Sequence, residues 1–298
     1  MKPAPFEYFR PRSLDEALAL LDEHGGDAKP LAGGQSLIPA MNFRLATPSV
    51  LVDLNEIPEL SYVREQGGEV RIGGMVRQRT VERSALVSQR VPLLAEAMPH
   101  IAHPAIRNRG TIAGSLAHAD PAAELPAVVL ALKATLVVTS ALGAREVAAD
   151  DFFVGLFSTA VQPGELLTEI RIPPPPPRSG FAFQEISRRH GDFALVGVAG
   201  AVQLDDRGRC RQARVALVSV GDRPMAAGQA ANLLTGQAPT AESIRAAADA
   251  AASRDIDPSS DIHASARYRR QLASVLTRRV LERAFARAAQ GDVGQTRE

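Results

Sequence analysis

The sequence has little of several residue types, and each shortage excludes a class of function. It contains one cysteine, Cys210, so it forms no internal disulfide framework and cannot hold an iron–sulfur cluster with its own thiolates. It has no tryptophan and only three tyrosines, so no aromatic side chain stands out for stacking on a ligand. The net charge of +1 provides no basic field, and we therefore exclude nucleic acid as a partner.

Long apolar runs are also missing. No stretch of about eighteen apolar residues occurs, so we predict no membrane span. The opening residues, MKPAPFEYFRPRS, lack a continuous apolar segment, so we expect no secretory signal and a cytoplasmic protein. The composition is otherwise typical of a globular protein, with 45% hydrophobic and 22% charged residues. The 298 residues are enough for two or three domains.

Local patterns in the first half predict a small α/β arrangement. Ser13 and Glu16 have the spacing of a capping box, and the helix that follows is expected to stop at Gly25. Thr80 is expected to cap another helix that runs towards Leu86. Further helices are predicted at residues 93–98 and 122–132, and strands at residues 29–31, 50–53, 69–72 and 135–139.

A run of five prolines, residues 173–177, marks the clearest boundary. Proline cannot continue a helix or a central strand, so the run predicts a stiff linker. It could also bind an aromatic groove of a partner, a reading that we consider weaker. We therefore predict one domain at residues 1–177, a second at 178–290, and a disordered tail at 291–298.

The second half predicts strands followed by helices. Strands are expected at residues 181–187, 194–204 and 213–220, with a hairpin turn at 205–208. Helices are expected at residues 226–234, 241–252 and 264–289. The last helix carries one apolar stripe, and its arginines lie mostly off that stripe. We interpret those arginines as a solvated face, with docking of an acidic partner as the alternative.

Two stretches of small residues recur about 80 residues apart, PLAGGQSLIPAMNFR at residues 30–44 and GTIAGSLAHADPAAELP at 110–126. Glycine permits positive φ angles, and successive bare amides in such turns form a concave nest for anions. Two such turns could together bind one diphosphate. The pair Gly33-Gly34 also has a simpler interpretation as a tight turn after a strand. The sequence contains neither a G-x-x-x-x-G-K-[ST] loop nor a G-x-G-x-x-G match at the first stretch, so we exclude those phosphate-binding motifs.

Four segments together carry a resemblance to a known family. They are AGGQSLIP at residues 32–39, TIAGSLAHADPAAELP at 111–126, ISRRHGDFALV at 186–196 and SARYRRQLASVLTRRVLERA at 265–284. They resemble segments of the FAD-binding medium subunit of molybdenum hydroxylases, the family of xanthine and carbon monoxide dehydrogenases. The carbon monoxide dehydrogenase medium chain is the nearest type.

The resemblance implies an α+β fold. Its first part would be a two-lobed FAD-binding domain of the PCMH type, similar to that of vanillyl-alcohol oxidase. A small C-terminal domain would follow, with a three-stranded antiparallel sheet and a helical bundle.

The resemblance also implies a binding site for FAD. Residues of the first loop and of the second loop would wrap the diphosphate, and His118 and Asp120 would lie along the ribityl or diphosphate region. Glu124 would hydrogen-bond ribityl hydroxyls, and Gln184 and the loop at residues 188–192 would approach the isoalloxazine. The full set of expected cofactor-binding residues is Ala32, Gly33, Gly34, Gln35, Ser36, Leu37, Thr111, Gly114, Ser115, His118, Asp120, Glu124 and Gln184.

Several of these residues also have structural interpretations. Glu124 could serve as a helix N-terminal acid, and Asp192 as a turn residue. His118 and Asp120 lack further ligands at a suitable spacing, so we predict no metal site. Two positions depart from the family pattern, because Ala113 replaces a common glycine and Gln184 replaces a common lysine. We nominate no catalytic residue.

The implied function is that of an oxidoreductase subunit which is active only within a complex. A large molybdenum-cofactor subunit and a small subunit with [2Fe–2S] clusters would be its partners, in a dimer of heterotrimers. Electrons would pass through FAD to NAD or a quinone. The alternatives are a stand-alone flavin-dependent oxidoreductase and a flavin-free assembly subunit. The substrate and the electron acceptor are not specified by the sequence.

Overall fold

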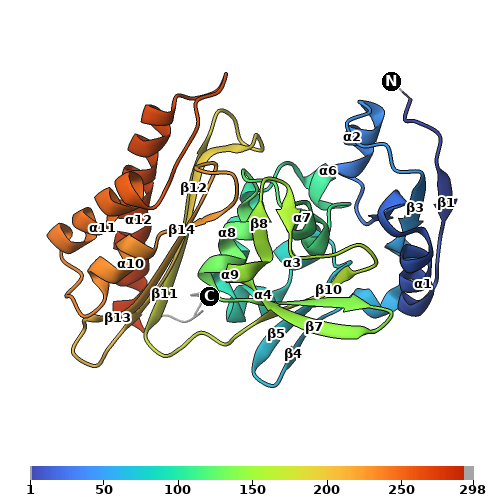
Figure 1. The fold of residues 1–298 in the computed structure, drawn as a ribbon. Coiled ribbons are helices and arrows are strands. Elements are labelled where there is room, and N and C mark those ends of the chain that lie inside the picture. The colour runs from blue at the N-terminus through green and yellow to red at the C-terminus, as the bar shows by residue number, and fades with distance from the viewer. Residues whose placement is uncertain (1, 292–298) are drawn as a thin grey trace.

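The structure is a computed structural model that describes residues 2–291. Figure 1 shows three parts in a row, with the N-terminal lobe at one end, a central lobe, and the C-terminal sheet with its helices at the other end. This mixed arrangement of sheets and helices is the α+β fold that the resemblance implies.

The N-terminal lobe is a three-stranded parallel sheet with the strand order β1-β3-β2. Its elements are β1 (Glu7–Phe9), α1 (Leu14–His24), β2 (Ala28–Leu31), α2 (Leu37–Asn42) and β3 (Val50–Asp53). Ser13 caps α1 as predicted, because its hydroxyl accepts from the Glu16 N–H at 3.2 Å. The Glu16 carboxylate accepts from the Arg12 N–H at 2.8 Å instead of from Ser13, so the capping box is only half formed.

The central lobe is built on a five-stranded antiparallel sheet with the order β4-β5-β10-β6-β7. Its strands are β4 (Val63–Gln66), β5 (Glu69–Gly73), β6 (Thr135–Ser140), β7 (Gly143–Ala148) and β10 (Leu166–Ile172), with a small hairpin of β8 (Phe153–Gly155) and β9 (Ser158–Thr159). Its helices are α3 (Gln78–Glu82), α4 (Ala85–Arg90), α5 (Pro92–Ala97), α6 (Pro104–Arg107), α7 (Ile112–His118), α8 (Glu124–Ala131) and α9 (Ala149–Phe152). The prediction of a helix capped by Thr80 is wrong, because Thr80 lies inside α3 and Ser84 caps α4 by accepting from the Val87 N–H at 3.3 Å.

The C-terminal part contains the three predicted antiparallel strands and one additional short strand. The strands are β11 (Ser179–Ser187), β12 (Ala194–Leu204), β13 (Cys210–Val218) and the two-residue β14 (Met225–Ala226). The predicted hairpin turn joins β12 and β13, where the Gly208 N–H donates to the Asp205 carbonyl at 3.0 Å. The helices α10 (Gly228–Leu234), α11 (Ala241–Arg254) and α12 (Ala266–Gln290) cover one face of this sheet.

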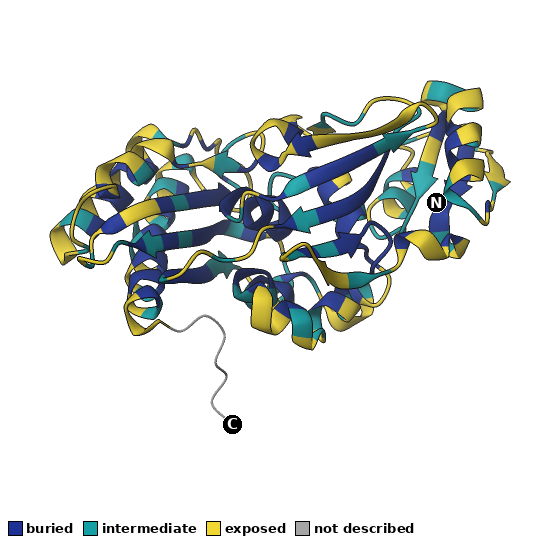
Figure 2. Ribbon diagram, turned by 90° about the horizontal axis from the view of Figure 1, so that it is seen from below, coloured by how far each residue is buried: buried dark blue, intermediate teal, exposed yellow. Residues whose placement is uncertain are grey.

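The two faces of β11 belong to different cores. Phe181 and Phe183 join the core of the central lobe, whereas Ala182 packs in the core beneath the C-terminal helices. This division follows from the period of two residues along a strand. Figure 2 shows the buried residues running along the strands of both sheets. The C-terminal sheet is therefore packed directly against the central lobe, where β11 contacts α5 and the strands β12 and β13 contact α8.

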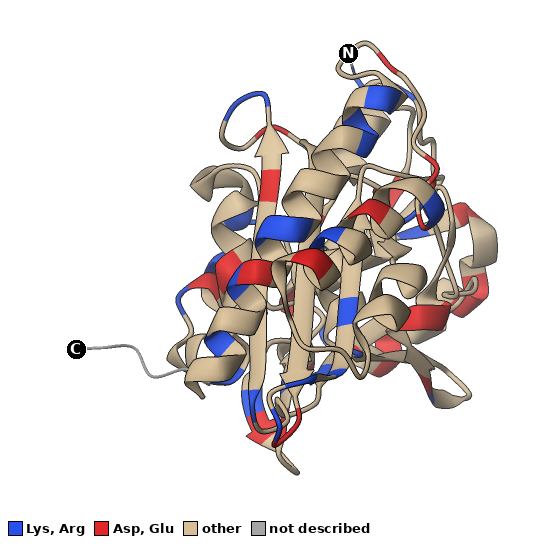
Figure 3. Cartoon of the chain, turned by 90° about the vertical axis from the view of Figure 1, so that its left-hand side faces the viewer, with Lys and Arg blue, Asp and Glu red and all other residues tan. Residues whose placement is uncertain are grey.

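The interpretation of the α12 arginines as a solvated face needs correction. Arg269 is 6% exposed, and its guanidinium donates to the Leu195 carbonyl at 2.6 Å and to Asp261 Oδ2 at 2.7 Å. Arg283 and Arg287 both pair with Glu96 of the central lobe, at 2.7 and 2.6 Å. Figure 3 shows basic and acidic residues interspersed over the C-terminal helices α10, α11 and α12. An arginine that lies off the apolar stripe of a helix can still bond to backbone carbonyls of a neighbouring element, because its side chain is long. Helical periodicity cannot reveal such contacts.

The proline run lies between β10 and β11, as a linker should. The expected disordered tail, residues 291–298, lies outside the described residues except for Gly291. The domain limits at 177 and 290 stay a prediction. Within residues 2–291, every helix is too short or too polar to cross a membrane.

Candidate functional site

The two small-residue loops meet in the folded chain. A Cβ atom added to Gly33 would lie 2.3 Å from the Arg109 carbonyl oxygen and 2.8 Å from the Gly110 Cα. A Cβ atom added to Gly114 would lie 3.5 Å from the Ala32 Cβ. Glycine is thus required at residue 33 because the backbones of the two loops are in direct contact. The contact places both loops at one side of the junction between the N-terminal and central lobes.

The first loop presents unpaired backbone donors. Gly34 has a φ of +70°, and the chain turns there from β2 into α2. The N–H groups of Gly34, Gln35 and Ser36 donate to no acceptor within residues 2–291, and the Gln35 side chain folds back onto the Gly33 carbonyl at 3.2 Å. Leu37 begins α2 and is half-buried. Three successive free amides in a turn with positive φ form the kind of nest that binds phosphate oxygens.

The second loop differs, because its own structure uses its amides. The Ile112 N–H donates to the Val76 carbonyl at 3.1 Å, and the Ala113 N–H donates to the Gly74 carbonyl at 3.3 Å. The Gly114 N–H donates to the Thr111 hydroxyl at 3.0 Å, so Thr111 is the N-cap of α7. Successive backbone N–H groups without an acceptor therefore occur in the first loop. The second loop presents small residues and the half-exposed Ser115.

Asn55 and Arg77 tie the two loops together, and the sequence analysis missed both. The Asn55 side-chain amide donates to the Ala32 carbonyl at 3.0 Å, and its oxygen accepts from Arg77. Arg77 also donates to the Arg109 carbonyl. Partial burial lowers the pKa of Arg77 below its ordinary value, with the nearby Arg109 charge as a second cause. The polar residues that directly follow the buried strand β3 were the signal that could have pointed to Asn55.

His118 and Asp120 lie at the end of α7. The His118 ring is half-buried and lies 5.1 Å from the Phe157 ring, measured between ring centres. Ala119 takes the left-handed conformation with a φ of 51° and turns the chain, and Asp120 Oδ1 accepts from the Ala122 N–H at 2.9 Å. Asp120 therefore has a clear local role in the turn. Within residues 2–291, no three His, Cys, Asp or Glu side chains are grouped to hold a metal ion.

Glu124 is the first residue of α8 and is 5% exposed. Burial, and secondarily the negative charge of Glu185, raise its pKa to about 8. Glu185 lies on β11, opposite Gly197 of β12, and a Cβ on Gly197 would lie 3.3 Å from the Glu185 Cβ. The C-terminal sheet is fixed here by the Ser219 N–H, which donates to the Pro121 carbonyl at 2.8 Å.

Gln184 does not join this group. The alternation along β11 places Glu185 on the same face as Phe183, towards the central lobe, and Gln184 on the opposite face. The loop at residues 188–192 does reach the central lobe, because a Cβ on Gly191 would lie 2.4 Å from the His103 ring. His103 directly precedes α6, which leads into the second loop. Of the predicted residues, Gly114 thus lies against Ala32 and Gly33 lies against the backbone that directly precedes Thr111, whereas Gln184 lies on the opposite face of β11.

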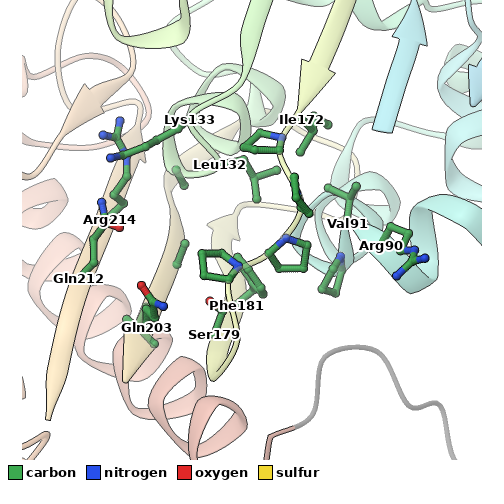
Figure 4. Close-up of a pocket in the computed structure, with 18 residues that line it drawn as sticks. Arg90, Val91, Leu132, Lys133, Ile172, Ser179, Phe181, Gln203, Gln212 and Arg214 are labelled. Atoms are coloured by element: carbon green, nitrogen blue, oxygen red, sulfur yellow. The ribbon is translucent and has the colours of Figure 1, made fainter. Parts of the chain in front are cut away.

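A separate cavity of about 150 Å³ lies at the other end of α8 (Figure 4). Ala131 and Leu132 line it from α8 and the turn that follows, Phe181 from β11, and Pro173 to Pro176 from the linker. Arg90, Lys133 and Arg214 are the charged residues of its wall. None of the predicted cofactor-binding residues lines this cavity.

Comparisons with known proteins agree with this geometry. Residues 4–175 match the family model described as the FAD binding domain in molybdopterin dehydrogenase, and residues 181–284 match the CO dehydrogenase flavoprotein C-terminal domain. The chain belongs to the family of FAD-binding medium subunits of molybdenum hydroxylases. Members of this family are subunits of oxidoreductase complexes.

Three relatives illustrate the likeness. The 6-hydroxypseudooxynicotine dehydrogenase complex subunit alpha of Paenarthrobacter nicotinovorans is 44% identical, over 97% of both chains. The carbon monoxide dehydrogenase medium chain of Afipia carboxidovorans is 42% identical, over 97% of this chain and 99% of the relative. A solved carbon monoxide dehydrogenase from Hydrogenophaga pseudoflava superimposes with a TM-score of 0.93 at 41% identity, covering 96% of this chain and 99% of that chain.

The residues of this flavoprotein subunit fit FAD. The free amides at residues 34–36 suit a diphosphate, and the close contact at Gly33 lets the second loop lie beside them. FAD, when bound, would supply the redox chemistry. The chain's own residues bind the dinucleotide, orient it and set its surroundings.

The PCMH-type fold, the C-terminal sheet with its helices, and FAD as the cofactor are all confirmed.

Proposed function

We propose that this subunit passes electrons from the [2Fe–2S] clusters of a small partner subunit through FAD to an external acceptor such as NAD or a quinone. A large molybdenum-cofactor subunit would oxidise the substrate, and the whole would be a cytoplasmic dimer of heterotrimers. The observation that carries the proposal is the meeting of the two loops at Gly33 and Arg109, with the free amides of residues 34–36 beside that contact.

The state of the single cysteine supports dependence on a partner for the clusters. Cys210 is 1% exposed within the C-terminal core, where burial raises the pKa of its thiol to about 11. A neutral, buried thiol is a poor metal ligand and a poor nucleophile. Electrons that reach the flavin through iron–sulfur clusters must therefore come from another chain.

We propose the expected residues of both loops, together with Asn55 and Arg77, as the set that holds FAD. Ala32 to Leu37 would bind the diphosphate, and Thr111, Gly114 and Ser115 would support it from the second loop. His118, Asp120 and Glu124 would lie along the ribityl chain. Gln184 has the weakest support, because its side chain leaves the opposite face of β11.

The experiment is a stepwise reduction of the purified, FAD-loaded chain under anaerobic conditions. Addition of candidate substrates alone should leave the flavin absorbance unchanged. Addition of substrate together with the large and small partner subunits should bleach it. Bleaching by a small substrate without partners would instead identify a stand-alone oxidoreductase. A purified chain that takes up no FAD would support a flavin-free assembly role.

A further inference from the structure

A buried carboxylate lies behind the contact between the two small-residue loops. Asp53 ends β3 and is 6% exposed. Its neighbour across the sheet, Leu31, ends β2, and the first small-residue loop follows directly. The period of two residues along β3 places Val50 and Val52 in the apolar core of the N-terminal lobe and leaves Asp53 on the other face. The carboxylate therefore does not serve the packing of that core.

Both oxygens of Asp53 accept hydrogen bonds. Oδ1 accepts from the Asn55 backbone N–H at 3.0 Å and from the Asn55 side-chain amide. Oδ2 accepts from the hydroxyl of Tyr8 on β1. Tyr8 reaches this oxygen because it pairs with Leu51, which lies two residues before Asp53 on the same face of β3. Asp53 thus links the first strand of the chain to Asn55.

The surroundings of Asp53 keep it ionised. Burial opposes ionisation, but the hydrogen bonds from Tyr8 and Asn55 outweigh burial and lower the pKa of the carboxyl below its ordinary value. Arg10 adds a weaker attraction, with its Nε 3.9 Å from Oδ2, while its guanidinium also pairs with Glu56 at 2.8 Å. At neutral pH, Asp53 is therefore an acceptor of hydrogen bonds and donates none.

An acceptor at this position decides how the Asn55 amide is turned. The amide has one accepting oxygen and an NH₂ group that donates twice. Because Asp53 can only accept, the NH₂ group must face it, and the same group donates to the Ala32 carbonyl at 3.0 Å. The amide oxygen then faces Arg77, which donates to it and to the Arg109 carbonyl. An amide turned the other way would set its oxygen against two acceptors and its NH₂ group against a guanidinium.

We propose that Asp53, held by Tyr8, is a positioning residue of the cofactor site, because it fixes the orientation of the Asn55 amide and thereby the backbone of the first loop. Its role towards FAD rests on the proposed function. The Ala32 carbonyl that Asn55 holds lies just before the turn whose N–H groups, at residues 34–36, donate to no acceptor within residues 2–291. We call Tyr8, Asp53, Asn55 and Arg77 the β3 network. A tyrosine on the first strand should therefore affect how tightly the chain binds FAD.

The first variant is Tyr8→Phe, because Tyr8 is half exposed and loses only its hydroxyl. We expect the FAD affinity of the folded chain to fall about three- to tenfold, which is part of the free energy of a hydrogen bond to a charged group. FAD affinity is measured by quenching of flavin fluorescence. Tyr268→Phe is the matched control, since Tyr268 is 44% exposed on α12 and should leave the affinity unchanged. An unchanged affinity in Tyr8→Phe would overturn the proposal.

Two variants of β3 separate positioning from stability. Asp53→Asn removes the charge and can present its own NH₂ group to Asn55, so the Asn55 amide is no longer forced into one orientation and FAD affinity should fall about tenfold. Val52→Ala removes buried volume from the same strand and should lower the melting temperature, while the FAD affinity of the folded chain stays within about twofold. If FAD affinity followed the melting temperature in both variants, Asp53 would have a structural role alone.

A thermodynamic cycle of Tyr8→Phe with Arg77→Met tests whether the β3 network acts as a unit. Tyr8 bonds to Asp53. Arg77 bonds to Asn55 and to the Arg109 carbonyl, so it shares no hydrogen-bond partner with Tyr8 within the described residues 2–291. Independent sites lose FAD affinity additively, to within about twofold. The proposal requires the double variant to lose clearly less affinity than the two single variants together, and additive losses would overturn it.

NMR spectroscopy of the apoprotein tests the orientation of the Asn55 amide without FAD. The side-chain NH₂ signals of Asn55 and the backbone N–H signal of Gly33 should shift in Tyr8→Phe and stay in place in Tyr268→Phe. Signals that do not move in Tyr8→Phe would overturn the β3 network directly. A chain in which these signals move but which takes up no FAD would keep the network and reject the FAD site of the proposed function, so the two failures are distinguishable.

Discussion

Gly33 lies so close to Arg109 that the missing Cβ of the glycine would come within 2.3 Å of the arginine's carbonyl oxygen. The two residues are far apart in the sequence, and each begins or precedes one of the small-residue loops. Their contact determines how the amides of residues 34–36 sit beside Thr111 and Gly114. The first prediction follows from it.

Gly33→Ala should separate the two loops and weaken FAD binding. Real Cβ atoms do not come within 2.3 Å of a backbone oxygen, so one loop must move, at a cost of about 1–3 kcal/mol. The measurement is the flavin-to-protein ratio of the purified chain. Gly26→Ala is the control, since a Cβ there meets nothing within 4 Å and should leave the ratio unchanged. Full flavin content in Gly33→Ala would contradict the interpretation of the contact.

Thr111→Val should weaken FAD binding by removing the N-cap of α7. The Gly114 N–H would lose its acceptor, and the loss of a cap typically costs about 1 kcal/mol. The matched control is Thr240→Val, which removes the cap of α11 on the far side of the molecule. Both variants should lose similar stability in urea unfolding. If they lost FAD affinity equally, Thr111 would have no local role.

Asn55→Ala should reduce FAD affinity by about 10- to 100-fold, because it leaves the Ala32 carbonyl without its Asn55 donor and removes the Asn55 acceptor of Arg77, which keeps its bond to the Arg109 carbonyl, at a cost of about 1–3 kcal/mol. Isothermal titration of the apoprotein with FAD measures the effect. Arg77→Met and the double variant complete a thermodynamic cycle. Effects that simply add would mean that Asn55 and Arg77 act independently and do not couple the loops.

Glu124 should make the stability of the apoprotein depend on pH. Its pKa is raised from 4.5 to about 8 in the folded chain, so the folded state binds the proton more tightly than the unfolded state. The free energy of unfolding should therefore fall as the pH rises from about 4.5 to about 8, and the contribution of Glu124 should level off above that. Urea unfolding of the unmodified chain and of Glu124→Gln measures the difference. A variant with the same pH slope in this window would show that other groups cause it.

Arg269→Met should destabilise the C-terminal part while FAD binding is retained. The change removes bonds to two backbone carbonyls and to Asp261 from a side chain that is 6% exposed. Unsatisfied buried carbonyls cost about 1–3 kcal/mol each, so the melting temperature should fall by several degrees. Differential scanning calorimetry measures it. An unchanged melting temperature would support the earlier interpretation of a solvated arginine face.

Most of the secondary structure could be predicted because it depends on local chemistry. Ser13 caps a helix, alternation in residues 194–204 gives a strand, and Gly208 closes a hairpin. The helix start at Thr80 failed, since Ser84 offers a competing cap four residues later. The short strands β1 and β4 were not predicted, because few residues carry the signal in a strand of three or four residues. The seven-residue strand β10 was not predicted either.

The sequence by itself determined the small residues of both loops, the family to which the chain belongs and therefore its cofactor, because these depend on residue types in a fixed order. The tertiary structure decided which amides stay free, because partners such as the carbonyls of Gly74 and Val76 come from the turn after β5. It also decided that Glu124 is buried within reach of the charge of Glu185, some 60 residues further along the chain. The protonation state of a buried acid depends on its neighbours in space, and no local pattern of the sequence contains that information.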